Sequence, residues 1–411
     1  MSTSMALPLV RAVARAKVPQ GSVTSTGARS RYFSISPRHH VRAVFGETSN
    51  ETLRTTLNTI QEKITLPAHL PKAQRKILRD PKRKNYIEQN PVVIEIEGLE
   101  HKYTKIIFPN ELPNSKKIFK DAIRAMETAE DWANLETLLA GYKKAGIVLK
   151  PKHLGFATRL AIAKTQLYSV IDCARHAKNT GYVLTVGESG LEVVMALADR
   201  AMTENHAQSI KWLEQLQDVL ERSPHSDLTG PKDLRSSRLA RGMMVSARVS
   251  DIEASETPSE TQLNLLSDEV GFLRASWETA FEHASGPLQL EIDELNLNSL
   301  RPIANTSEDG TTKALSNPYD RIAPYFITKF IAHNIKACES APVLLGQACE
   351  PLGDVGKKLD DYLTERITES SERSAGLRSR LPTLALAYQQ ILGRAPTWAQ
   401  PAAEESKAEA A

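Results

Sequence analysis

The sequence has 411 residues, of which 41% are apolar and 25% are charged, and its formal net charge is +3. This composition is typical of a folded globular protein, and so small a net charge excludes attraction to nucleic acid through the overall field alone. Three cysteines form no CxxC pair and fit reduced, buried thiols better than a metal or redox site: Cys173, Cys338 and Cys349.

The first 45 residues have the composition of a mitochondrial transit peptide. They contain seven Arg and Lys residues, many Ser and Thr, and no acid. The segment 31–34 (Arg-Tyr-Phe-Ser) resembles the site cut by the matrix processing peptidase, so we expect cleavage after Phe33. No apolar run approaches the roughly 18–20 residues that span a bilayer. The mature protein is therefore expected in the mitochondrial matrix.

Residues 46–112 are expected to form a short amphipathic helix, a basic arm and an extended segment. The arm holds seven cations and one acid, Asp80, and it is either a solvated surface or a phosphate-binding element. The candidate contacts with RNA phosphates are its seven cations: Lys72, Arg75, Lys76, Arg79, Lys82, Arg83 and Lys84. Between 91 and 108, β-branched and aromatic residues on both sides of Gly98 predict a small β-hairpin or an extended segment.

Residues 113–222 are predicted to form helical hairpins, because the stretch 119–184 repeats itself. A shift of 35 residues superimposes apolar, lysine and glycine positions: Trp132 on Leu167, Leu135 on Val170, Lys143 on Lys178 and Gly146 on Gly181. A third hairpin, 190–201 with 208–221, follows at a stretched spacing. A fixed period of this size is typical of stacked helical hairpins. The predicted fold class is therefore all-α.

The second half of the chain is predicted to contain further helices after a break. Residues 223–260 are rich in Ser, Pro and Gly and are expected to be a linker with one short helix. Residues 261–395 carry apolar residues at helical spacing and predict a C-terminal helical domain. The tail 396–411 lacks core-forming residues and is expected to be disordered.

The hairpin whose second helix ends in Lys-Lys-Ala-Gly-Ile (143–147), followed by Pro151, resembles a pentatricopeptide repeat. That resemblance implies a solenoid that binds single-stranded RNA, one base per repeat. Residues 152–156 (Lys-His-Leu-Gly-Phe) lack the small polar residue of base-reading repeats, so no base-reading residue is assigned. The resemblance covers about 100 residues. The chain as a whole resembles fungal mitoribosomal or mitochondrial mRNA-handling proteins.

The sequence contains no motif that predicts catalysis. It has no phosphate-binding loop, and the segment 187–190 (Gly-Glu-Ser-Gly) lacks the spacing of a nucleophile elbow. The ten His residues are scattered. We therefore expect no enzyme activity, cofactor, metal or small-molecule substrate.

Two roles remain open from the sequence. The first is a component or associate of the mitochondrial translation machinery, which binds rRNA or mRNA through the basic arm and contacts ribosomal proteins. The second is a matrix scaffold that assists assembly or stability of a respiratory complex through protein contacts. In the second role, the basic arm is expected to contact the anionic surface of the inner membrane.

Overall fold

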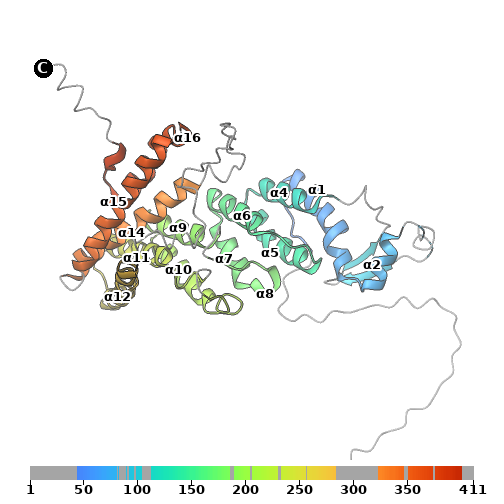
Figure 1. Cartoon of the computed structure of the whole chain (residues 1–411). Coiled ribbons are helices and arrows are strands. Elements are labelled where there is room, and N and C mark those ends of the chain that lie inside the picture. Colours follow the sequence, from blue (N-terminus) through green and yellow to red (C-terminus); the bar gives the residue numbers. More distant parts are fainter. Residues whose placement is uncertain are drawn as a thin grey trace, which may run out of the picture.

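A computed structural model describes most of the chain, in these ranges: 44–80, 82, 89, 92–96, 99–103, 113–185, 189–203, 206–229, 233–255, 257–283, 323–346, 350–373 and 375–399. The fold is dominated by helices and is elongated, with α2 near one end and α15 at the other (Figure 1). The expected transit peptide lies outside the described residues, except for 44 and 45.

Helix α1 (Glu51–Ile60) forms because its start is capped and one face is apolar. The side chain of Asn50 accepts hydrogen bonds from the backbone N–H groups of Thr52 and Leu53 at 3.0 and 3.2 Å. On the following turns of the helix, the side chains of Leu57 and Ile60 are buried in the core. A π-helical turn (Gln61–Thr65) and a 3-10 turn (Leu66–His69) then lead toward the basic arm.

The arm contains a helix, α2 (Lys72–Arg79), which starts after Pro71. Beyond it, strands β1 (Val92–Ile96) and β2 (Leu99–Tyr103) pair in antiparallel register, with Val92 opposite Tyr103. These strands lie within the 91–108 segment. Residues 83–88 and 104–112 are outside the described part of the chain.

The central hairpins form two adjoining layers of helices: α4 (Ser115–Ala125), α5 (Ala129–Lys144), α6 (Pro151–Ala163), α7 (Leu167–Arg175), α8 (Ala177–Thr180), α9 (Gly190–Ala201) and α10 (His206–Leu220). In one layer α4 contacts α6, and α6 contacts α9. In the other layer α5 contacts α7 and α8, and α7 contacts α10. The layers join through pairs such as Phe119 and Tyr142, whose ring centroids are 5.4 Å apart.

Local residues set the ends of these helices. Asn114 caps α4 by accepting hydrogen bonds from two backbone N–H groups, and Thr128 forms a capping box with Asp131 at the start of α5. Gly146 and Gly181 have φ angles of +73° and +74°, the left-handed conformation that ends a helix without strain at glycine. The glycines that the 35-residue shift superimposes therefore end equivalent helices.

The C-terminal part packs around one long helix, α14 (Ala323–Leu345), which contacts α9, α11, α12, α15 and α17. The other described elements of this part are α11 (Arg238–Ala254), α12 (Glu260–His283), α15 (Glu350–Arg373), α16 (Ala375–Arg378), α17 (Leu381–Leu392) and a 3-10 turn (Thr397–Ala399). None of the described helices combines the length and apolar character needed to cross a membrane.

Helix α11 corrects the prediction that 223–260 is a linker with one short helix. It has 17 residues, and most of its side chains are buried between α9 and α14. Small residues such as Gly242 and Ser246 allow α14 to approach closely: a Cβ built on Gly242 would lie 1.8 Å from Asn334 Oδ1. The helix also carries large apolar residues such as Met243 and Val249, but the Ser, Pro and Gly residues on either side of it give the whole segment the composition of a loop.

The chain end also differs from the prediction. Residues 397–399 form a 3-10 turn, and Trp398 packs edge-on against Tyr388 with 6.3 Å between ring centroids. Structure therefore extends to 399, and residues 400–411 are not described.

Cys173 and Cys338 are buried, which raises the pKa of both thiols, as expected for structural cysteines. Cys349 lies outside the described residues.

Candidate nucleic-acid interface

Helix α2 arranges the predicted cations into one stripe. Positions 72, 75, 76 and 79 are spaced three and four apart, so the helical backbone places them on the same face. Lys72 and Lys76 are exposed and Arg75 is half-buried. Lys82, just beyond the helix, is also exposed, and its backbone N–H donates to Asp80 Oδ1 at 3.0 Å.

The remaining predicted contacts are only partly placed. The backbone of Arg79 belongs to α2, but its side chain, like Arg83 and Lys84, is outside the described set. Among the side chains that are described, no carboxylate forms an ion pair with Lys72, Arg75 or Lys76. Cations at this spacing repel one another, so the stripe favours a polyanionic partner.

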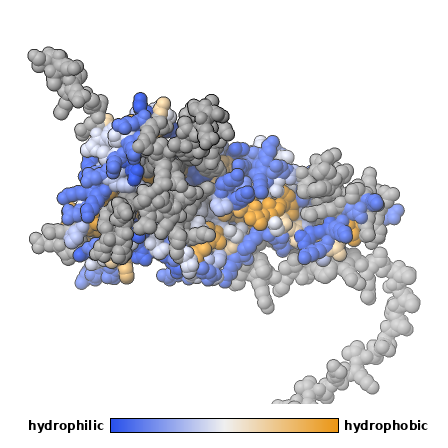
Figure 2. Space-filling view, in the orientation of Figure 1, coloured by the Kyte–Doolittle hydropathy of each residue, from blue (hydrophilic) through white to orange (hydrophobic). Residues whose placement is uncertain are grey.

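The basic character near α2 extends to α5, which contributes Lys144. The Lys144 Nζ atom lies 3.0 Å from Nδ1 of His69, a residue in the turn that precedes α2 in the sequence. Burial and the Lys144 charge lower the pKa of His69 to about 4, so His69 stays neutral at physiological pH. In Figure 2, the coloured surface at this end of the molecule is mostly hydrophilic, with a small apolar area beside it.

A second group of cations lies on α4 and α6, and it was not predicted from the sequence. Burial lowers the pKa of the His153 imidazole, and the charges of Lys120, Lys152 and Lys116 lower it further. Three ammonium groups are therefore close enough to one buried ring to act on its charge. The sequence contained their charges but not their proximity, because the residues come from two helices.

An aromatic ring lies beside this second group. Lys120 Nζ is 5.9 Å and Arg124 Cζ is 5.4 Å from the centre of the Phe156 ring. Both distances fall within the range of cation–π contacts. Arg124 also pairs with Asp121 at 3.1 Å, so part of its charge is neutralised. Basic side chains next to an aromatic ring are a combination that single-stranded nucleic acid can use.

One buried cluster resembles a catalytic relay but serves packing. Ser246 Oγ lies 3.0 Å from His333 Nδ1, and His333 Nε2 lies 3.1 Å from Asp199 Oδ1. Asp199 also accepts a hydrogen bond from Lys329 Nζ at 2.7 Å. Ser246 and His333 are both 0% exposed, so a substrate has no access to the hydroxyl. The cluster connects α9, α11 and α14.

The comparison with known proteins decides the family. The family model of mitochondrial ribosomal protein mS27 matches residues 31–387. The chain belongs to the mS27 family. The match includes the basic arm, the central hairpins and most of the C-terminal helices, so all of these are parts of one family architecture.

A curated relative agrees with the family. The small ribosomal subunit protein mS27 of Neurospora crassa is 27% identical over 179 residues, which are 43% of this chain and 45% of the relative. The alignment thus spans less than half of that relative. The family to which the chain belongs is one of mitochondrial ribosomal proteins. The predicted resemblance to mitoribosomal proteins is confirmed.

Proposed function

We propose that this mS27-family protein is a non-enzymatic component of the small subunit of the mitochondrial ribosome in the matrix, and that it binds RNA phosphates through the α2 stripe. The observation that carries the proposal is the alignment of Lys72, Arg75 and Lys76 on one face of α2 without a paired carboxylate among the described residues. The name of the Neurospora relative supports the assignment to the small subunit.

The stripe suits the phosphate backbone better than base edges. Lysine and arginine side chains neutralise phosphates whatever the sequence, and binding releases counterions. The expected partners are rRNA or mRNA, together with neighbouring ribosomal proteins. Arg83 and Lys84 extend the same basic segment in sequence. Anionic lipid at the inner-membrane surface also attracts basic segments, but it is a weaker candidate because the family is one of ribosomal proteins.

The central hairpins serve as the scaffold in this proposal. The contacts of α4 with α6 and of α5 with α7 support a stack of hairpins like that of pentatricopeptide-repeat proteins. The cations around Phe156 then provide a second RNA contact on α4 and α6. Base-by-base reading is not part of the proposal.

The direct test is the salt dependence of RNA binding by the full chain. Fluorescence anisotropy with a labelled single-stranded RNA gives the binding constant at each salt concentration. In a plot of its logarithm against the logarithm of the salt concentration, the slope should become shallower by about 2 when Lys72, Arg75 and Lys76 are replaced by Gln, since each lost phosphate contact removes about 0.7. A matched control replaces three exposed cations elsewhere: Lys211, Lys357 and Arg378. Equal slopes in the two triple variants would refute the role of α2.

The cellular test separates the ribosome from a respiratory complex. Tagged protein in a mitochondrial lysate should sediment with the small ribosomal subunit and be released by nuclease or high salt. The triple α2 variant should be released at lower salt than the control variant. Sedimentation with a respiratory subcomplex would instead support the matrix scaffold role. Binding to anionic vesicles in place of RNA would support a membrane contact.

A further inference from the structure

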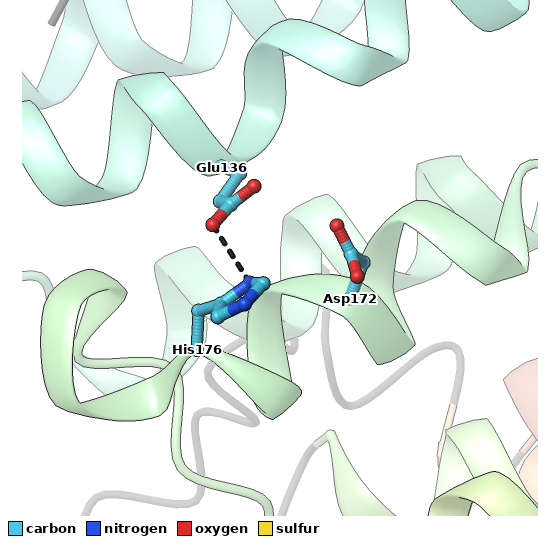
Figure 3. A group of neighbouring side chains, drawn as sticks. All are labelled: Glu136, Asp172 and His176. Carbon is cyan, nitrogen blue, oxygen red and sulfur yellow. Dashed lines mark ion pairs between the residues drawn. The ribbon is translucent and has the colours of Figure 1, made fainter. Parts of the chain in front are cut away.

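Three side chains that bind metals in other proteins meet where two consecutive hairpins touch. Glu136 projects from α5, Asp172 projects from α7, and His176 follows the last residue of α7 (Figure 3). One ligand atom from each residue lies within 4.8 Å of those of the other two. Among the described residues, this is the one place where three His, Cys, Asp or Glu side chains lie close enough to share a metal ion.

The arrangement follows from the helix geometry. Asp172 and His176 are four residues apart, so both point toward α5. The His176 Nδ1 atom lies 2.8 Å from Glu136 Oε1. The side chains of Glu136, Asp172 and His176 are 22%, 30% and 42% exposed, so the site is shielded but still open to a solvent molecule.

The two carboxylates and the imidazole converge from neighbouring hairpins, so their ligand atoms can share one ion. Arg175 donates to Asp172 Oδ1 at 2.8 Å and to Gln215 Oε1 at 3.3 Å. It therefore holds Asp172 in position from outside, as hydrogen-bonded partners of metal ligands do.

We propose that Glu136, Asp172 and His176 bind one divalent transition-metal ion such as Zn²⁺, which links α5 to α7. One imidazole nitrogen and two carboxylate oxygens suit Zn²⁺, whereas Mg²⁺ and Ca²⁺ prefer oxygen ligands only. With four ligand bonds of about 2.0–2.2 Å, neighbouring ligand atoms lie about 3.3–3.6 Å apart, so His176 Nδ1 and Glu136 Oε1 separate slightly from 2.8 Å to admit the ion. A water molecule on the exposed side completes the four ligands.

The ion binds through the unprotonated Nδ1 atom of His176 and the carboxylates of Glu136 and Asp172. The result is a cross-link between neighbouring hairpins that does not depend on RNA binding at α2.

The test uses the untagged full chain after chelator treatment. Isothermal titration with Zn²⁺ should give one ion per chain, and thermal unfolding should shift upward with Zn²⁺ but not with equimolar Mg²⁺. His176→Gln and Asp172→Asn should each weaken Zn²⁺ binding by about tenfold or more. His206→Gln, at the start of α10, is the matched control and should bind Zn²⁺ like the unchanged protein.

Two results would overturn the metal site. One is equal Zn²⁺ affinity in the His176→Gln and His206→Gln variants. The other needs no variant: Co²⁺ added to the unchanged protein should produce the strong visible absorption of a four-coordinate site, and its absence refutes the proposal. Failure of RNA binding in the α2 variants would leave both results unaffected.

Discussion

Lys143 donates a hydrogen bond from Nζ to the backbone carbonyl of Lys178, 35 residues later, at 2.6 Å. It also donates to the carbonyl of Ala177 at 3.3 Å. Both carbonyls belong to the single turn of α8, and the Ala177 carbonyl also accepts a hydrogen bond from the Gly181 N–H at 2.8 Å. The lysine of one repeat thus caps the helix of the next, and the sequence period has a direct counterpart in the contacts.

Replacing Lys143 by Met should destabilise the junction between these two repeats. The variant keeps the aliphatic stem and loses the charged donor, so we expect the free energy of unfolding to fall by about 0.5–1.5 kcal/mol. Urea denaturation followed by circular dichroism measures the loss. Lys178→Met is the control, because Lys178 takes part through its backbone carbonyl, and no loss is expected there. A similar loss in both variants would contradict the capping role.

Gly242→Ala should destabilise the contact between α11 and α14. The new methyl group would collide with Asn334, whose Nδ2 donates to the carbonyls of Leu239 and Phe330 at 3.1 and 2.8 Å. We expect a loss of about 1–3 kcal/mol in the free energy of unfolding.

Gly271→Ala provides the matched control for that prediction. Gly271 also lies inside a helix, α12, but no atom comes within 4 Å of a Cβ built there. This substitution should stabilise the protein by up to about 1 kcal/mol, through helix propensity alone. Equal effects of the two substitutions in a denaturant titration would show that α11 and α14 do not pack as described.

Asp199→Asn should weaken the buried cluster that Asp199 forms with His333 and Lys329. It should also change how the free energy of unfolding depends on pH in the acid range. Burial alone would raise the pKa of Asp199, but the hydrogen bond and charge of His333 and the charge of Lys329 lower it. Its stabilising contribution is therefore present above pH 3.8 and is lost as the pH falls through the lower, folded-state pKa. We expect the variant to lose about 1.5–3 kcal/mol at neutral pH.

The stabilising contribution of Lys329, which pairs with Asp199, should persist into the alkaline range. Burial lowers the pKa of Lys329, but Asp199 outweighs this effect and raises it above 10.5, so its contribution is lost only as the pH rises through that value. Denaturant titrations from pH 2 to 11 test both limbs. Asp218→Asn, which breaks the exposed pair with Arg222, should change stability by less than about 0.5 kcal/mol.

His69→Gln should remove a loss of stability in mild acid. The folded-state pKa of His69 is about 4, below its ordinary value of 6.5, because the ring is buried beside Lys144. As the pH falls from 6.5 towards 4, the unfolded chain takes up the proton first, so the native protein loses stability. Over that pH interval, the free energy of unfolding measured by urea titration should fall less in the His69→Gln variant than in the unchanged protein.

The NMR titration of His69 gives an independent check. Lys144→Met removes the nearby charge, so the pKa of His69 should rise toward 6.5 without reaching it, because burial remains. A pKa of His69 near 6.5 in the unchanged protein would contradict the contact with Lys144.

Helices with capped ends and large apolar residues were predictable from the sequence. The start of α4 at Asn114 and the glycine stops at Gly146 and Gly181 depend on neighbouring residues only, which a single sequence contains. The cations of the basic arm were equally visible. Their alignment was not, because it requires knowing that 72–79 is helical.

Features made by contact between separate helices were not predictable. The ring of His153 among three lysines and the meeting of Glu136 with His176 each join residues of different helices. The length and burial of α11 were underestimated, because its close contact with α14 depends on small residues such as Gly242 that are also typical of loops. The proposed boundaries at 222 and 260 stay predictions, and limited proteolysis would test them.

The position of α14 in the chain also has a consequence for how the protein acquires its structure. Helices α9 and α11 are complete by residue 254, yet the helix that covers them begins only at Ala323. While the chain emerges from the N-terminus onward, their apolar faces have no cover until that later segment arrives. Such exposed surface invites aggregation, so this half of the protein should depend on chaperones more than the hairpins from α4 to α8 do.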